Sequence, residues 1–189
     1  MRSAAALSLA IATLLQGCTA AFDTIRGQPR NVADEQPAWT ESLQDSALEA
    51  RSMQRLRGSD KHLADAAITV ACANGVILMA GQVPTEALRQ SAYHIVRNIE
   101  GVRVVYSRLA VAPARSPEQR AEDAWITARI RAGMQLADVG LSQRVKVVTV
   151  DKTVYLLGRV NAQTAARAVR LARGTRRVFR VEPLFEHAQ

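Results

Sequence analysis

The sequence predicts an α+β protein made of two tandem copies of one small unit, each running helix, strand, strand, helix, strand. An internal repeat is the first observation, because residues 68–72 and 76–83 align with residues 145–149 and 153–160 after a shift of 77 positions. The second observation is periodicity: β-branched residues recur at alternate positions in 144–150 and 153–160, and apolar residues recur at helical spacing in the segments around the strands. We expect each unit to form a three-stranded mixed sheet with both helices packed on one face.

The chain opens with an apolar segment that is too short to cross a membrane. Residues 4–15 are almost all apolar or small, whereas a spanning helix needs about 20 such residues. The segment closes on the motif LLQGC at positions 14–18, which resembles the bacterial lipobox. The resemblance implies that residues 1–17 are a signal peptide and that Cys18 carries acyl chains such as palmitate. An ordinary secretory signal, with an incidental Cys18, is the alternative.

Residues 18–44 show no sustained periodicity and contain Gly27, Pro29 and Pro37. We therefore expect a flexible tether behind the lipidated cysteine. Thr19 stands where an Asp would be the usual signal for retention in the inner membrane. The lipobox resemblance implies that a lipoprotein without this Asp goes to the outer membrane, so the protein is expected on the periplasmic face of that membrane.

The first unit is expected at residues 45–113. Its two paired strands, at 68–72 and 76–83, are joined by Asn74-Gly75, a dipeptide typical of tight hairpin turns. Cys72 lies in the first of these strands and is expected to be buried like a small apolar residue. A helix starts at Pro84-Thr85-Glu86, and a strand at 102–111 follows it. The helix is expected to face the core with Leu88, Ala92, Ile95 and Ile99.

The second unit is expected at residues 114–189. Ser116, Pro117 and Gln119 form a helix-start signature with a capping box, and this helix should run to about Leu136. Strands are expected at 144–150 and 153–160, with Asp151-Lys152 as the turn, and at 178–185. Between them lies a helix that ends at Gly174 and whose packing stripe is Ala165, Ala168, Val169 and Ala172.

This order of elements, with its Asn-Gly-type turn and a Gly-x-Val exit at 81–83, is similar to the BON domain. Two such units behind a lipobox resemble the dual-BON outer-membrane lipoprotein family, which is related to the osmotically inducible periplasmic BON proteins. The resemblance covers about residues 45–185 and the signal segment. The second unit departs from the pattern, because Lys152 replaces the usual turn glycine and Arg177-Val178 replaces Gly-Val.

The resemblance implies that the second unit binds anionic phospholipid, such as phosphatidylglycerol, and supports envelope integrity at division sites or under stress. The matching positions on its first helix are Trp125, Thr127, Arg129 and Arg131. Helical geometry places Trp125 at the border of the core-facing stripe with Arg129 one turn further on, a combination that suits the head-group interface. Packing of Trp125 in the core or between the units, at the place that Leu48 holds in the first unit, is the alternative.

The chain has a formal net charge of +8, and most of it falls in the second unit. Residues 45–113 carry +2, whereas residues 114–189 carry fourteen basic and seven acidic side chains, a net charge of +7. Arg167, Arg170 and Arg173 recur at every third position. They form either a solvated helix face or a second contact for anionic head groups. Nucleic acid is a usual partner of such charge, but it is not expected in this compartment.

No pattern of catalytic residues stands out in the sequence. The three histidines, His62, His94 and His187, are scattered without the spacing of metal ligands. We therefore expect no enzyme, no metal and no cofactor beyond the covalent lipid on Cys18. A second hypothesis is a protein adaptor, in which the units hold a partner such as the outer-membrane assembly machinery and the lipid is only a tether. Exposure of Trp125 beside positive charge would favour the lipid hypothesis.

Overall fold

The computed structural model describes residues 38–187, with side chains from residue 43 onward. The signal segment, Cys18 and most of the expected tether therefore lie outside the described residues. Helix α1, Ala38–Ser59, begins within the range assigned to the tether. Within the described residues, no helix combines the length and apolar character needed to cross a membrane.

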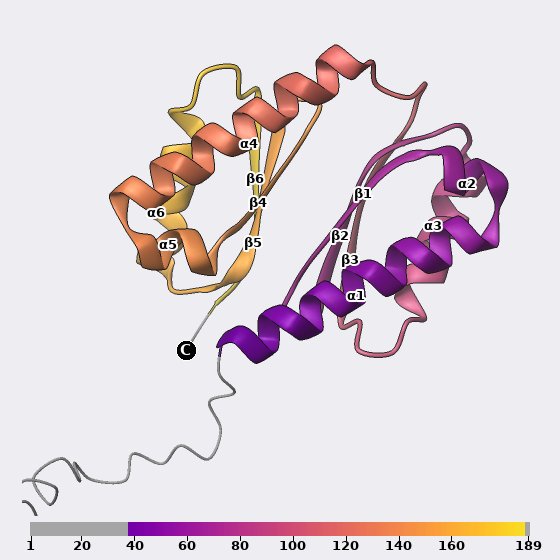
Figure 1. Ribbon diagram of the computed structural model, residues 1–189, viewed down its shortest axis with the longest axis horizontal. Helices are drawn as coiled ribbons and strands as arrows, with labels where there is room; N and C mark the ends of the chain where they lie inside the picture. The colour runs from indigo at the N-terminus through magenta and orange to yellow at the C-terminus, as the bar shows by residue number, and fades with distance from the viewer. Residues whose placement is uncertain (1–37, 188–189) are drawn as a thin grey trace, which may run out of the picture. The chain divides into compact units, whose positions relative to one another are not determined.

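The described chain contains two copies of one αββαβ unit, each with an added short helix (Figure 1). The first unit is α1, α2 (Lys61–Asp65), β1 (Ala67–Ala73), β2 (Val76–Val83), α3 (Glu86–Arg97) and β3 (Val104–Val111). The second unit is α4 (Pro117–Ala137), α5 (Val139–Arg144), β4 (Lys146–Val150), β5 (Thr153–Val160), α6 (Ala162–Arg173) and β6 (Arg180–His187). The expected α+β class and element order are confirmed, and the short helices α2 and α5 are additions to them.

Each sheet has three strands and a mixed topology. In the first sheet β2 pairs antiparallel with β1 and parallel with β3, and in the second β5 pairs in the same way with β4 and β6. A parallel pair needs a crossover connection, and α3 and α6 provide it. The mixed sheet of each unit is therefore the one expected from the sequence.

The two long helices of each unit pack on one face of its sheet. The first core includes Leu56, Ile77, Met79, Ala92 and Val96, and the second includes Ile126, Ile130, Leu156, Ala168 and Ala172. The other face of the central strands is also buried, because Leu78 and Ala80 of β2 share an apolar cluster with Tyr155 and Leu157 of β5. Burial on both faces explains why these strands read as continuous apolar runs.

The hairpin turn of the second unit is held by a buried carboxylate. Asp151 and Lys152 have φ angles of 51° and 58°, as a type I′ turn requires. The carboxylate of Asp123 on α4 accepts hydrogen bonds from both of their backbone N–H groups, each at 2.9 Å. Nζ of Lys152 also lies 3.2 Å from Glu122. These contacts stabilise the turn although Lys152 replaces the usual glycine.

In the first unit, too, a carboxylate of the first helix binds the amides of the hairpin turn. The two equivalent carboxylates define how the helices of the two units align. Asp45 of α1 accepts hydrogen bonds from the N–H groups of Asn74 and Gly75, at 2.7 and 3.0 Å. Asp45 and Asp123 are 78 positions apart, whereas the two hairpin strands repeat after 77. The first unit therefore has one additional residue between its first helix and its first strand.

That additional residue corrects the expected equivalence of Leu48 and Trp125. With the helices aligned on their aspartates, Leu48 corresponds to Ile126, and both side chains are buried. Trp125 corresponds to Ala47, and both are exposed. The indole of Trp125 is 42% exposed, so it occupies no position in the core or in the apolar cluster between the sheets.

Candidate functional site

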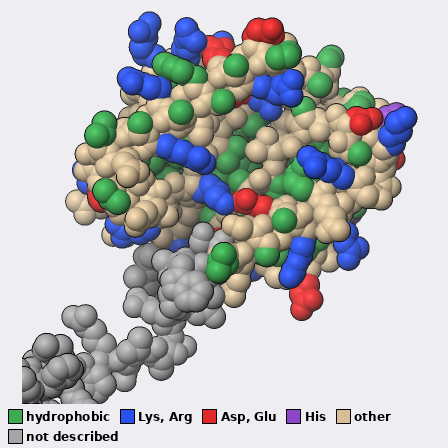
Figure 2. Space-filling view, in the orientation of Figure 1, with side chains coloured by type: hydrophobic (Ala, Val, Ile, Leu, Met, Phe, Trp, Pro, Cys, Tyr) green, Lys and Arg blue, Asp and Glu red, His purple; other side chains and the backbone are tan. Residues whose placement is uncertain are grey.

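The positive charge of the second unit is largely on its surface. Among its exposed side chains are many arginines of α4, α6 and the loop that follows α6. Figure 2 shows Lys and Arg side chains gathered around hydrophobic ones over this part of the molecule. The two helices that carry several of these arginines, α4 and α6, lie next to each other.

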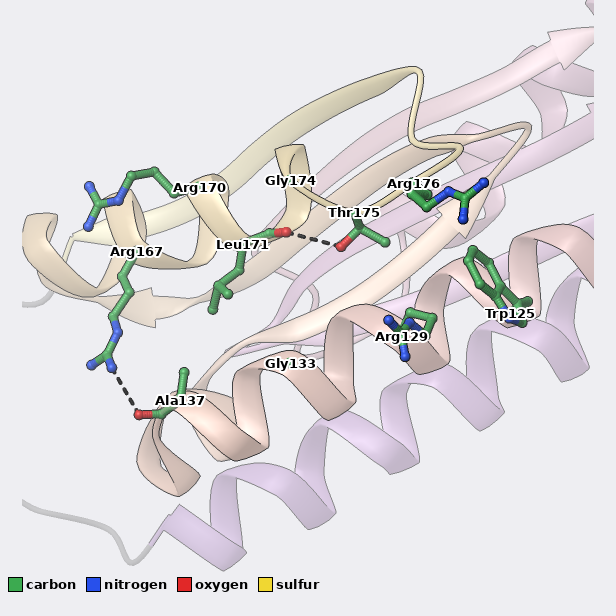
Figure 3. Close-up of a pocket in the computed structure, with 10 residues that line it drawn as sticks. All are labelled: Trp125, Arg129, Gly133, Ala137, Arg167, Arg170, Leu171, Gly174, Thr175 and Arg176. Carbon is green, nitrogen blue, oxygen red and sulfur yellow. Dashed lines mark hydrogen bonds between the residues drawn. The ribbon is translucent and has the colours of Figure 1, made fainter.

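A groove of about 640 Å³ lies between α4 and α6 (Figure 3). Four of its ten lining residues are arginines, and none is acidic. It is lined by Trp125, Arg129, Gly133 and Ala137 of α4 and by Arg167, Arg170, Leu171, Gly174, Thr175 and Arg176 of α6 and the residues after it. The groove therefore presents an indole and four guanidinium groups to a ligand.

Helical spacing explains the α4 side of the groove. Trp125, Arg129, Gly133 and Ala137 follow one another at four-residue intervals, so their side chains share one face of the helix. Gly133 leaves open space, because a Cβ atom built on it would meet nothing within 4 Å. The small residues Gly133 and Ala137 thus keep the groove open at the C-terminal end of α4, beyond the large side chains of Trp125 and Arg129.

The arginines differ in what else they contact. Arg167 donates a hydrogen bond from Nη2 to the carbonyl of Ala137 at 2.9 Å, at the end of α4 where backbone carbonyls lack helical partners. Among the described side chains, those of residues 43–187, no carboxylate lies within ion-pair distance of Arg129, Arg170 or Arg176. Their charge is therefore available to an anionic ligand, whereas Arg167 also links α6 to α4.

A profile of the BON domain matches residues 44–113 and 122–187, which together exceed half of the chain. The chain belongs to the BON-domain family. The two BON domains correspond to the two structural units, and the resemblance seen in the sequence is confirmed.

Curated relatives align with this chain over most of their length. The chain is 28% identical to Outer membrane lipoprotein DolP of Haemophilus influenzae, over 96% of this chain and 94% of the relative. It is 28% identical to the 21 kDa hemolysin of Actinobacillus pleuropneumoniae, over 86% and 84%. It is 31% identical to Osmotically-inducible protein Y of Escherichia coli, over 64% and 61%.

The four positions predicted on α4 do not form one patch. Trp125 and Arg129 line the groove, but Thr127 and Arg131 lie on the side of α4 that faces β4. The hydroxyl of Thr127 donates to Oγ1 of Thr149 at 2.8 Å, and Nη2 of Arg131 donates to the carbonyl of Val147 at 3.2 Å. These two contacts hold the helix against the sheet of the second BON domain.

The arginine stripe of α6 is divided in a similar way. Arg167 and Arg170 line the groove, whereas Arg173 is exposed but is not among the lining residues. Arg176, which had no role assigned from sequence, lines it as well. The signal for Arg176 was its place in the basic run after Gly174, but only the fold brings that run beside Trp125.

Arg177 contacts Trp125 directly. Its guanidinium carbon lies 5.3 Å from the centroid of the indole ring, which is cation–π distance, and Nη1 lies 3.7 Å from Glu122. Arg177 has a φ angle of 69°, and Gly101 has a φ angle of 90° at the corresponding point of the first BON domain. The departure from Gly-Val noted in the sequence therefore lies at the edge of the candidate site.

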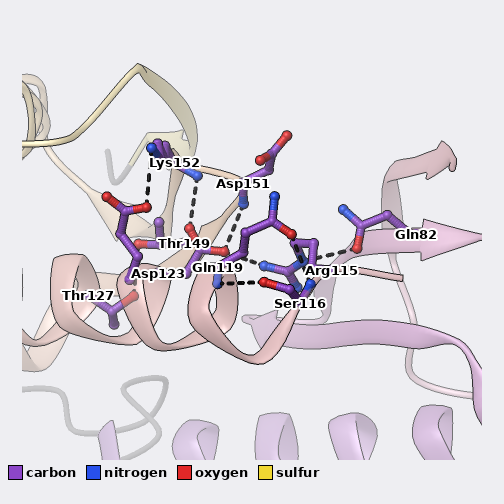
Figure 4. A network of polar contacts seen from close by, with 10 residues as sticks. Gln82, Arg115, Ser116, Gln119, Asp123, Thr127, Thr149, Asp151 and Lys152 are labelled. Carbon is purple, nitrogen blue, oxygen red and sulfur yellow. Dashed lines mark hydrogen bonds and ion pairs between the residues drawn. The ribbon is translucent and has the colours of Figure 1, made fainter. Parts of the chain in front are cut away.

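Sequence reasoning missed the polar network beneath α4 (Figure 4). Asp123 is 4% exposed and forms an ion pair with Arg115, which lies in the segment that connects the two BON domains. Nε of Arg115 also donates to Oε1 of Gln82 in β2 at 3.0 Å. Asp123 thus joins the connecting segment, the hairpin turn and the helix that carries Trp125. The one feature of the sequence that could have indicated this network is that Asp123 places a carboxylate beside the core-facing stripe of α4.

The described residues offer little for metal or thiol chemistry. Among the side chains that the structure describes, from residue 43 to residue 187, no group of three His, Cys, Asp or Glu is placed to hold a metal ion. Cys72 is buried and its Sγ donates to Asp45 at 3.1 Å. Burial, followed by that hydrogen bond, raises the pKa of the Cys72 thiol far above its usual range. The thiol is therefore protonated and unreactive at neutral pH.

Proposed function

We propose that this chain is a lipid-anchored protein of the outer membrane that binds anionic phospholipid through the groove between α4 and α6. The observation that carries the proposal is the half-exposed Trp125 in a groove with four arginines and no acidic lining residue. Similarity along nearly its whole length to a relative named Outer membrane lipoprotein supports the location. Lipid on Cys18 and the periplasmic face remain part of this proposal.

The chemistry of the groove suits a phosphodiester head group. A guanidinium forms paired hydrogen bonds with phosphate oxygens, and each Lys or Arg near an anionic surface contributes about 1 kcal/mol. The indole suits the boundary between head groups and acyl chains, because it combines an apolar body with one N–H donor. The lipid phosphate would be bound by Arg129, Arg170 and Arg176. Trp125 would lie beside the part of the acyl chains that is next to the head group.

A tether on the same chain lowers the affinity that such a site needs. A covalent anchor keeps the BON domains at a high local concentration near the bilayer, so a weak site is occupied for much of the time. Head-group binding would then decide which membrane region the domain occupies. This is how phospholipid binding would support envelope integrity at division sites or under stress.

Liposome binding by the chain from Thr19 to Gln189 tests the proposal, because this chain lacks the acyl anchor and retains every described residue. Vesicles of phosphatidylglycerol and phosphatidylcholine are compared for the wild type and for Trp125→Glu. Ala47→Glu is the matched control, since it places the same charge at the corresponding helix position of the first BON domain. We expect binding to phosphatidylglycerol alone, lost in Trp125→Glu and kept in Ala47→Glu.

Absence of wild-type binding to either vesicle would refute the proposal. The acyl chains would then account for all membrane attachment, and the BON domains would be adaptors for a protein partner. Equal loss in Trp125→Glu and Ala47→Glu would also count against the groove, because it would reflect added negative charge at any position.

A further inference from the structure

The loop between α6 and β6 exposes an aromatic side chain among cations. Phe179 is 81% exposed, and Arg176, Arg177 and Arg180 around it are exposed as well. The loop lies at the top of the second BON domain in Figure 1, where Figure 2 shows hydrophobic and basic side chains together. A Phe exposed to this extent contributes little to the core. Its position among cations makes it a candidate for contact with another surface.

The first BON domain shows that the fold does not require Phe here. The N–H of Phe179 donates to the carbonyl of Lys152 at 2.9 Å, and the N–H of Arg103 donates to the carbonyl of Gly75 at 2.8 Å. The two residues therefore hold the same place beside their hairpin turns. In the first domain the Arg103 side chain pairs with Glu186 at 2.9 Å. In the second domain the same place carries the exposed Phe ring.

The backbone of the loop is strained at its second arginine. Arg177 adopts a φ angle of 69°, which is unfavourable for a residue with a Cβ atom, where the first domain has glycine. Strained backbone positions of this kind are concentrated at functional sites. The guanidinium of Arg177 lies over the Trp125 ring, so the strained residue connects the loop to the groove.

We propose that residues 174–180 form a second bilayer contact, in which Phe179 enters the boundary between head groups and acyl chains. Arg176 and Arg180 would bind lipid phosphates on either side of the ring. This inference rests on the proposed function, because it requires that the same domain binds an anionic bilayer. Arg176 also lines the groove, so loop and groove form one continuous surface.

Charge identifies the occupant of this surface as an anionic bilayer. The nearby carboxylates are already engaged, since Glu122 contacts Lys152 and Arg177, and Glu182 contacts Arg108 and Arg180. An aromatic ring with cations around it is the pattern that favours an anionic membrane interface. Two contacts, at Trp125 and at Phe179, would hold the domain in one orientation on the membrane, which a single contact would not.

A fluorescent label at Phe179 tests whether the loop enters the bilayer. The chain from Thr19 to Gln189 lacks Cys18, and its Cys72 is buried, so Phe179→Cys offers one reactive thiol for an environment-sensitive dye. Val111→Cys is the control, because Val111 is an exposed apolar residue of the first domain. We expect a blue shift of the dye at residue 179 on phosphatidylglycerol vesicles, none on phosphatidylcholine, and none at residue 111.

The unlabelled variant Phe179→Ser measures the contribution of the ring to affinity. We expect binding to phosphatidylglycerol vesicles to weaken about tenfold, with Val111→Ser unchanged and circular dichroism spectra like that of the wild type. If the wild type binds but the dye at 179 does not shift and Phe179→Ser binds normally, the loop contact is wrong and the groove stands. If the wild type does not bind, both proposals fail together.

Discussion

The guanidinium carbon of Arg177 lies 5.3 Å from the centroid of the Trp125 ring. Arg177 belongs to the loop after α6 and Trp125 to α4, so this contact joins the two segments that border the groove. Arg177 keeps a left-handed backbone conformation at a point where the first BON domain has glycine. The contact therefore links the least favourable backbone position of the loop to the residue most suited to a membrane interface.

Arg177→Gly should separate stability from lipid binding. Glycine relieves a strain of about 1–2 kcal/mol, and loss of the cation–π contact and added chain entropy offset it by about 1–2 kcal/mol together. We expect the free energy of unfolding in urea to stay within about 1 kcal/mol of the wild type. Binding to phosphatidylglycerol vesicles should weaken about threefold to fivefold. A large loss of stability with normal binding would show that Arg177 is purely structural.

Filling the groove should weaken binding without harming the fold. Gly133→Leu adds a side chain where a Cβ atom meets nothing within 4 Å, and it replaces a helix-interior glycine. We expect the protein to gain about 0.5–1 kcal/mol of stability while its affinity for phosphatidylglycerol vesicles falls. Gly58→Leu is the control, because Gly58 of α1 is equally open. Unchanged affinity in Gly133→Leu would mean that the ligand does not enter the groove.

Neighbouring arginines of α6 should differ in their effect on binding. Arg170 lines the groove and Arg173 does not, although both are exposed residues of one helix. Arg170→Gln should weaken binding to phosphatidylglycerol vesicles about fivefold, and Arg173→Gln less than about twofold. Both effects should shrink as salt is raised from 50 to 500 mM, because salt screens exposed charges. Equal losses would indicate attraction by net charge alone.

Loss of the buried carboxylate beneath α4 should destabilise the second BON domain. Asp123→Asn removes the charge that pairs with buried Arg115 and binds two turn amides. We expect a loss of about 3–5 kcal/mol in urea unfolding, because a buried guanidinium is left without its partner. Glu122→Gln, next to it on α4, removes more exposed ion pairs and should cost less than about 1 kcal/mol. A loss equally small for Asp123→Asn would contradict the role of the network.

Stability should fall at alkaline pH through Cys72. Burial raises the pKa of its thiol in the folded protein, so above about pH 9 the unfolded chain loses a proton that the folded chain keeps. The contribution is fully present below the unfolded pKa and declines as the pH rises above it. Urea unfolding from pH 7 to pH 10 should show this decline, and Cys72→Ala should reduce its slope. An unchanged slope in the variant would assign the decline to other groups, such as Tyr155, whose pKa burial also raises.

The elements of the fold could be predicted because they depend on local chemistry. The apolar runs of β1 and β2 and their repetition in β4 and β5 indicate strands. Asn74-Gly75 is a turn by its own conformational preference. Ser116 and Gln119 form the capping box expected of them. The buried stripe of α6 follows from helical periodicity. These signals lie within a few residues of one another, so they can be recognised without the tertiary structure.

The site was harder to predict because one residue changes the alignment of the helices. The hairpin strands repeat after 77 positions and the first helices after 78, so the equivalence of Trp125 and Leu48 was wrong. Family resemblance groups Thr127 and Arg131 with Trp125. In the structure they lie on a different side of α4 and contact β4. Asp123 is an ordinary acidic residue in sequence, and its role depends on a turn 28 residues away.

The sequence alone therefore determined the repeat, the order of helices and strands, the basic character of the second domain and the resemblance to BON proteins. Each of these follows from periodicity, composition or a short motif. Tertiary structure decided that Trp125 is exposed, that Arg170 and Arg176 share a groove with it, and that Phe179 projects into solvent. The reason is physical: these side chains come from segments up to 54 residues apart, and only packing of α4 and α6 on one sheet brings them together.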